Sequence, residues 1–137
     1  FFFFVFMKLI FAAEDTVIGI ICGLLLVGLT GKFFTLKLSN LVYLIIFIIY
    51  SIVILLDIVN ELRDLTTHFG FIVFSLLHSL ADLGIALAFT SHFSGWEIPY
   101  ITSIFAPYLQ NELVIFYIGA YLVIGNVVWL VLYPFLD

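Results

Sequence analysis

Charged residues are scarce in this sequence. Lys and Arg number four and Asp and Glu nine, so charged residues make up 9% of the 137 positions. A soluble domain carries about 25% charged residues, because its surface needs them. With 66% hydrophobic residues and a mean hydropathy of +1.37, a water-soluble fold of this size would expose most of its Leu, Ile and Phe side chains. The composition excludes a soluble globular domain and predicts an integral membrane protein.

Cations and cysteines are the scarcest of the reactive residues. Four cations are too few to neutralise nucleic-acid phosphates, and a net charge of -5 disfavours an anionic surface as the partner. Cys22 is the single cysteine and lies within an apolar run, so the sequence contains no disulfide framework. We therefore expect no nucleic-acid partner. The expected partners are lipids and other membrane protein subunits.

Long apolar runs dominate what is present. A membrane-spanning helix takes roughly 20 residues. Four runs of that length cover residues 16–36, 39–59, 70–90 and 113–133. In a chain of 137 residues, this pattern predicts one all-α domain over 1–137, built as a bundle of four transmembrane helices. Glu14, Asp15 and Thr16 are typical of a helix N-terminus, so the first span is expected to begin there.

Two further segments are expected to lie in the membrane interface. The apolar segment 1–13 is too short for a span and contains Lys8, which favours a short interfacial N-terminal segment. The connection 91–112 is too long for a turn, and its apolar residues fall on one helical face, which predicts an interfacial helix over about 99–110. Aromatic residues near the span ends are the predicted interface anchors: Trp96, Tyr100, Tyr108, Trp129 and Tyr133.

A polar stripe in the third span is the main candidate for chemistry. Ser75, His78, Ser79 and Asp82 are spaced by three and four residues, which places them on one helical face. At about 1.5 Å per residue, His78 and Asp82 lie near mid-bilayer, where an ionisable group costs a few kcal/mol. Two interpretations stay open, namely buried hydrogen bonds to a neighbouring helix or a role for protons, ions or a ligand. Asn126 in the fourth span is the predicted partner of this stripe.

Small residues and aromatic residues predict helix packing in the first two spans. The first span contains the glycines Gly19, Gly23, Gly28 and Gly31. The spacing Gly19-x-x-x-Gly23 lets two helices approach closely, and internal packing is favoured over dimerisation. In the second span, Tyr43, Tyr50 and Asp57 recur every seven residues with Phe47 and Ile54 between them, which predicts a packing seam.

Metal, cofactor and catalytic signatures are weak. Only His78 and Asp82 have ligand spacing, and two ligands do not make a metal site. The three histidines, His68, His78 and His92, all lie on or beside the third span, so this chain cannot hold a haem between two facing helices by itself. No nucleophile elbow accompanies the serines of the stripe. We expect no metal, no catalytic residues, no cofactor held by this chain alone, and no enzymatic activity.

Three classes of function are compatible with these features. The favoured one is a small accessory subunit that stabilises its neighbours in a larger, energy-converting membrane complex, such as a respiratory assembly. The first alternative is a small homo-oligomeric transporter or channel with His78 and Asp82 on its path. The second is a membrane anchor that shares a haem or quinone with a partner subunit. The expected location is an energy-transducing membrane, either an organellar inner membrane or a prokaryotic cytoplasmic membrane.

Overall fold

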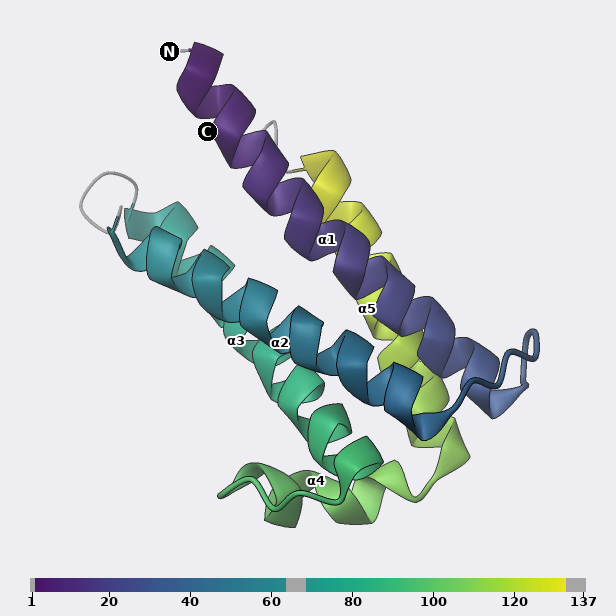
Figure 1. Cartoon of the computed structure of the whole chain (residues 1–137). Helices are drawn as coiled ribbons and strands as arrows, with labels where there is room; N and C mark the ends of the chain where they lie inside the picture. The colour runs from purple at the N-terminus through teal and green to yellow at the C-terminus, as the bar shows by residue number, and fades with distance from the viewer. Residues whose placement is uncertain (1, 64–68, 133–137) are drawn as a thin grey trace.

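The fold is all-helical over the part of the chain that the structure, a computed structural model, describes. These are residues 2–63 and 69–132, with side chains described over 16–59, at Leu62 and over 76–131. They form five helices and no strand (Figure 1). The helices are α1 (Phe2–Thr30), α2 (Asn40–Arg63), α3 (Phe69–Ser94), α4 (Ile101–Leu109) and α5 (Glu112–Leu132). The predicted all-α class is confirmed.

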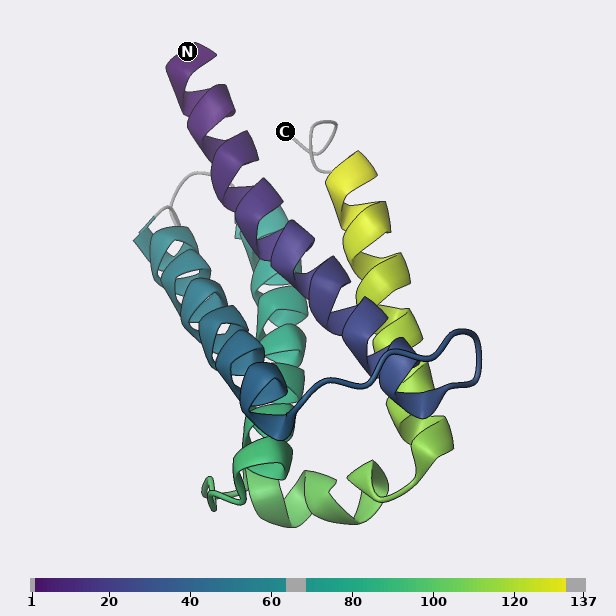
Figure 2. The same ribbon diagram turned by 45° about the vertical axis from the view of Figure 1, so that its right-hand side comes forward.

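The four long helices form two packed pairs. α1, α2, α3 and α5 run along one another, and α4 crosses one end of the bundle between α3 and α5 (Figures 1 and 2). The start of α1 and the end of α5 lie at the opposite end, where α1 extends further than α5. α1 packs along α5 and α2 packs along α3, and the two pairs are joined through α1 and α2. By contrast, α3 and α5 make few contacts with each other.

Three helices are long and apolar enough to cross a membrane. The candidate spans are Asn40–Val59, Leu76–Ser94 and Glu112–Val131. At 1.5 Å per residue, α5 is about 31 Å long, which matches a hydrocarbon layer of about 30 Å. The chain is therefore a membrane protein with transmembrane helices. In α1, the described apolar stretch Thr16–Thr30 is shorter than a span, so the described residues support three of the four predicted crossings.

The helix limits of α1 differ at both ends from the predicted limits of the first span, 16 and 36. α1 is continuous from Phe2 to Thr30, so no helix break separates residues 2–13 from the residues that follow, and Glu14 and Asp15 lie inside the helix. The placement of Glu14 agrees with helix propensity, because Glu is a good helix former. α1 ends early because Gly31 takes a φ of 68°, a left-handed value typical of the residue after a helix. The Leu36 amide then donates to the Gly28 carbonyl over 3.0 Å, which folds the chain back onto the helix end.

The remaining limits differ less from the prediction. α2 continues to Arg63, α3 extends from Phe69 to Ser94, and α5 ends at Leu132, so Tyr133 lies outside the described residues. The predicted helix over 99–110 is present as α4, which begins after Tyr100, a residue with a φ of 67°. Pro107 is tolerated inside α4, whose end follows two residues later.

Aromatic stacking joins α2 to α3. The predicted seam on α2 is buried, because Tyr43, Phe47, Tyr50 and Ile54 are inaccessible to solvent. The ring of Tyr43 stacks on Phe93 with centroids 4.8 Å apart, and Phe47 stacks on Phe89 at 5.3 Å. The Tyr43 hydroxyl also accepts a hydrogen bond from the Leu38 amide and donates one to the Leu36 carbonyl. The seam therefore fixes both α3 and the loop that follows α1.

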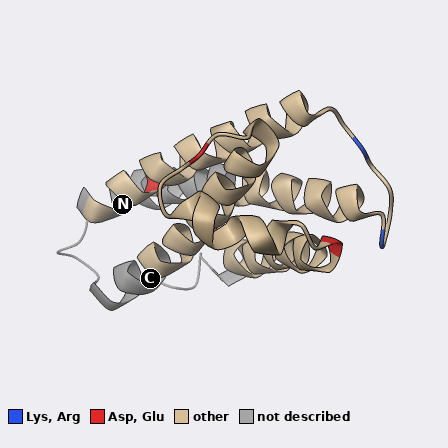
Figure 3. Cartoon of the chain, turned by 90° about the horizontal axis from the view of Figure 1, so that it is seen from below, with Lys and Arg blue, Asp and Glu red and all other residues tan. Residues whose placement is uncertain are grey.

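Most of the described charged side chains lie at the end of the bundle where α4 crosses. Both described lysines are in the loop after α1, and Glu112 is at the start of α5 (Figure 3). The described charges in this part of the chain are Lys32, Lys37, Glu97 and Glu112. The described charged side chains elsewhere are Asp57 on α2 and Asp82 on α3. This distribution leaves Asp82 far from the two described lysines.

Candidate functional site

Polar side chains from three helices meet halfway along the bundle. Asp82 is at the midpoint of α3, Tyr50 is near the midpoint of α2, and Asn126 comes from α5. Their exposed fractions are 2%, 0% and 3%. Together with His78, we call these residues the central polar cluster. The glycine Gly19 of α1 lies against it, so all four long helices take part.

His78 and Asp82 form the core of this cluster. One turn of α3 separates them, and the imidazole Nε2 lies 3.3 Å from Oδ2 of the carboxylate. The His78 side chain is 17% exposed, whereas Asp82 is 2% exposed. The imidazole also stacks on the indole of Trp129 in α5, with centroids 5.1 Å apart and planes at 27°. Trp129 thereby orients the imidazole and provides a contact between α3 and α5.

Tyr50 reaches Asp82 from the opposite helix pair. Its hydroxyl lies close enough to the Asp82 carboxyl group to act on it as a hydrogen-bond donor. The distance and angles of this contact do not meet the strict requirements for a hydrogen bond. By the same requirements, Oδ1 of Asp82 has no partner among the described residues. The sequence prediction placed Tyr50 in a packing seam and missed its polar contact. The available signal was its position, because a tyrosine at mid-span needs a hydrogen-bond partner when it is buried.

Asn126 bonds to its own helix rather than to the stripe. Its amide Nδ2 donates to the Leu122 carbonyl over 2.6 Å. A Cβ at Gly19 would lie 2.6 Å from the same Nδ2 and 2.9 Å from the Tyr50 hydroxyl. Within the described part of the chain, the predicted bonds from Asn126 to His78 and Asp82 are not formed. Asn126 packs against Gly19 instead. Only glycine can occupy position 19 at this distance, because any other residue would place a Cβ against the Asn126 amide.

The other predicted site residues are distributed along the bundle. Ser79 is buried at 3% exposure, and the side chain of Ser75 lies outside the described residues. Gly23 of α1 contacts α5, because a Cβ there would lie 2.6 Å from the Gly119 carbonyl oxygen. Gly28 packs against Phe34 and Leu36 of the following loop. Three predicted anchors are exposed near the end where α4 crosses, namely Trp96, Tyr100 and Tyr108.

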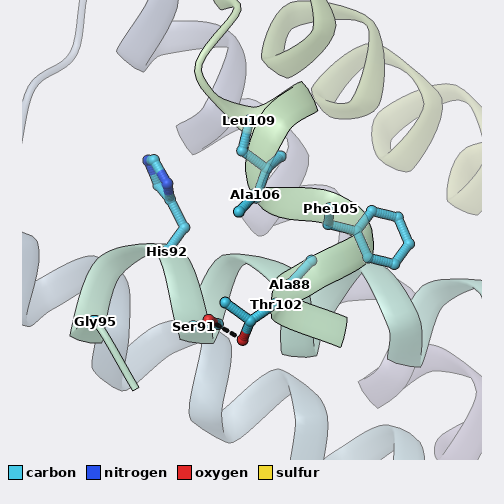
Figure 4. Close-up of a pocket in the computed structure, with 8 residues that line it drawn as sticks. All are labelled: Ala88, Ser91, His92, Gly95, Thr102, Phe105, Ala106 and Leu109. Atoms are coloured by element: carbon cyan, nitrogen blue, oxygen red, sulfur yellow. Dashed lines mark hydrogen bonds between the residues drawn. The ribbon is translucent and has the colours of Figure 1, made fainter. Parts of the chain in front are cut away.

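A second candidate site is a cavity of about 120 Å³ between the end of α3 and α4 (Figure 4). Its two hydroxyl groups, on Ser91 and Thr102, lie 2.7 Å apart. Ser91 also donates to the Trp96 carbonyl, and Thr102 accepts from the Ile98 amide. The His92 side chain extends away from this pair in Figure 4. The hydroxyls therefore hold α4 and its preceding loop against α3, and the cavity results from that packing.

The chemistry of the central polar cluster is that of acid–base and hydrogen-bonding groups. The described residues contain no group of three or more His, Cys, Asp or Glu side chains able to hold a metal ion. His68, one of the three histidines considered for haem binding, lies outside the described residues. Comparison of the chain with known protein families, with characterised proteins and with solved structures gives no match.

Proposed function

We propose that this chain is an accessory subunit of a larger membrane complex, and that a transmembrane helix of a partner subunit packs along the seam between α3 and α5. The seam is the side of the bundle on which neighbouring helices make few contacts. The proposal includes a fourth crossing by α1, whose continuous helix of 29 residues would be about 43 Å long. It also includes an energy-transducing membrane as the location of the complex.

Two tyrosines of α5 beside this seam carry the proposal. Tyr117 and Tyr121 are four residues apart, on one helical face, and are 62% and 43% exposed. Tyr121 lies about two turns before Trp129, whose indole stacks on His78, so Tyr121 lies near the side of α5 that faces α3. It is the tenth of the 21 residues in α5, at the depth where lipid offers no hydrogen-bond acceptor. A partner helix can supply acceptors for both phenols.

The central polar cluster supports a structural role for the chain itself. Asp82, Tyr50 and Asn126 are almost inaccessible and contact groups of this chain. The Tyr50–Asp82 contact crosses between helices, and a hydrogen bond between transmembrane helices typically contributes about 0.6 kcal/mol and up to about 2 kcal/mol. A bundle held from within can present its outer faces to other subunits without a rearrangement of its core.

A photo-crosslinking experiment with matched positions tests the docking face. A benzoylphenylalanine at position 121 probes the seam, and one at position 49 is the control. Ile49 is the tenth residue of α2 and is 47% exposed, so depth and exposure match those of Tyr121. We expect position 121 to crosslink to one heterologous subunit and position 49 to give little product. Native mass spectrometry of the gently extracted complex should give that subunit at a fixed ratio, and Tyr121→Phe should lower its occupancy.

Two results would contradict the proposal. Equal crosslinking from positions 121 and 49 would show that α5 presents no preferred face. A chain that is recovered only with copies of itself would favour the second candidate, a homo-oligomeric transporter or channel. The burial of the His78–Asp82 pair in the middle of the bundle is the observation that favours this candidate, and ion flux through reconstituted vesicles is its direct measurement.

A further inference from the structure

Among the described residues, no permanent cation lies near the carboxyl group of Asp82. This group is 2% exposed at the midpoint of α3, and the two described lysines, Lys32 and Lys37, are in the loop at the end where α4 crosses. The other described acidic groups in the candidate spans are Asp57, two turns beyond Tyr50 on α2, and Glu112 at the start of α5. An uncompensated carboxylate in a low-dielectric interior costs several kcal/mol even after relaxation. A proton held at this group would remove that cost without a cation from another residue.

Among the described ionisable groups around Asp82, His78 is the one that can share a proton with it as a cation. From α3 the facing group is His78, and from α2 it is the neutral phenol of Tyr50. From α5 it is the phenol of Tyr121. Near this level, the side chains described in α1, which begin at Thr16, include no ionisable group except the Cys22 thiol, one turn from Gly19. Neither a phenol nor a thiol brings positive charge.

The pair is electrically neutral when it holds one proton. Imidazolium with carboxylate and imidazole with carboxylic acid have the same net charge of zero, whereas imidazole with carboxylate leaves one negative charge buried. The Nε2–Oδ2 distance of 3.3 Å keeps the two sites of the proton adjacent. Oδ2 can take the proton that it shares with Nε2, while Oδ1, which has no partner in strict hydrogen-bond geometry among the described residues, stays available to the Tyr50 hydroxyl.

Exposure indicates the route by which the proton exchanges. The His78 side chain is 17% exposed and Asp82 is 2% exposed, so the imidazole is the more accessible of the two. Trp129 holds the ring with Nε2 facing the carboxylate. Imidazole takes up a proton on one nitrogen and releases one from the other, which suits it to transfer a proton between Asp82 and a water molecule or acidic group that reaches the exposed edge of the ring.

We propose that His78 and Asp82 together form an intramembrane proton-binding site that holds one proton and exchanges it through His78. The inference stands on the pair's own geometry and burial. It does not depend on the partner subunit, so its failure and the failure of the proposed function are separate results.

Solid-state NMR of the full chain in lipid bilayers, with labelled His side chains and labelled Asp carboxyl carbons, counts the protons on the pair. At neutral pH we expect either an imidazolium at His78 with an ionised Asp82, or a neutral His78 with a protonated Asp82. Asp82→Asn and His92→Gln assign the signals, with Asp57→Asn as the control carboxyl. A neutral imidazole beside an ionised carboxyl, or two protons on the pair, would overturn the proposal. If Asp82→Asn fails to fold, a wild-type spectrum with neither an imidazolium nor a protonated Asp overturns it equally.

Hydrogen–deuterium exchange tests the route in the same bilayers. In His78→Gln, the proton held at Asp82 should exchange about tenfold more slowly than the proton of the intact His78–Asp82 pair in the control His92→Gln, because glutamine does not relay a proton. The control histidine is on the same helix and is exposed. An unchanged exchange rate in a folded His78→Gln protein, or a variant in which Asp82 becomes ionised with no loss of folding, would show that His78 is not the partner in proton binding.

Discussion

The two helix pairs of this bundle are held together by opposite means. The contact between α1 and α5 is close because Gly19 and Gly23 have no side chain. A Cβ added at either glycine would lie 2.6 Å from an atom of α5. Between α2 and α3 the contact is filled by aromatic rings, with Phe47 stacked on Phe89 and Phe93 at 5.3 and 5.9 Å. In lipid the hydrophobic effect does not drive helices together, so both pairs depend on van der Waals packing.

The difference predicts opposite sensitivities to substitution. The contact at Gly23 leaves no room for a side chain, because the neighbouring atom is the backbone oxygen of Gly119, which cannot turn aside as a side chain can. Any added atom there must move a helix. A ring contact tolerates a change of shape but loses its partner atoms when volume is removed. The α1–α5 pair should therefore fail on enlargement, and the α2–α3 pair should fail on truncation.

The largest effect is expected from Phe47→Ala. Removal of a buried phenylalanine side chain costs about 3–5 kcal/mol in protein cores, and Phe47 is fully buried between two rings of α3. The free energy of unfolding, measured by SDS titration in mixed micelles, should fall by about that amount. Phe47→Leu keeps most of the volume and should cost under about 2 kcal/mol. Equal losses in the two variants would show that ring packing does not hold this pair.

A smaller effect, with a matched control of opposite sign, is expected at the glycines. Gly23→Ala places a methyl group 2.6 Å from the Gly119 carbonyl oxygen, so unfolding free energy should fall by about 1–3 kcal/mol. At Gly84 of α3 an added Cβ meets no atom within 4 Å. There the higher helix propensity of alanine should raise stability by up to about 1 kcal/mol. The same SDS titration compares both variants, and two changes of the same sign would contradict the glycine-contact interpretation.

The smallest effect is expected where α2 holds the loop that connects the two pairs. Tyr43→Phe removes a hydroxyl that donates to the Leu36 carbonyl and accepts from the Leu38 amide. The loss should be about 1 kcal/mol per net hydrogen bond, with faster amide exchange at Leu38. The control is Tyr117→Phe, since Tyr117 is 62% exposed on α5 and should leave the stability of the isolated chain unchanged. If Leu38 exchanges at the same rate in both variants, Tyr43 does not fix the loop.

Local spacing accounts for what could be predicted of the candidate site. His78 and Asp82 lie one turn apart on a single helix, so their contact follows from helix geometry alone. The contacts of these residues with Tyr50 and Trp129 cross between helices and were not predicted. Both aromatic residues were recognised in the sequence, but Tyr50 was assigned to a packing seam and Trp129 to the membrane interface. Neither assignment could specify a partner, because partners across helices depend on their relative register.

The helix limits show the same division. The apolar runs predicted where three membrane-crossing helices lie, because a span must hide its backbone polar groups within an apolar helix. The end of α1 depended instead on the left-handed φ of Gly31 and on a bond from Leu36 back to Gly28. Likewise, Asn126 bonds to Leu122 on its own helix while it packs against Gly19. The exact helix end and the Asn126 contacts therefore depend on how the chain packs around them.

Composition and periodicity were enough to establish a helical membrane protein in which an imidazole and a carboxyl group share one face of a helix. They suffice because they reflect the solvent and the fixed geometry of a single helix. The pairing of α1 with α5 through glycines, the pairing of α2 with α3 through aromatic rings, and the approach of Tyr50 to Asp82 became known from the packed bundle. Register between helices is set by the fit of side chains and backbones along the whole contact. This fit depends on both helices, so it cannot be predicted from the sequence of one helix alone.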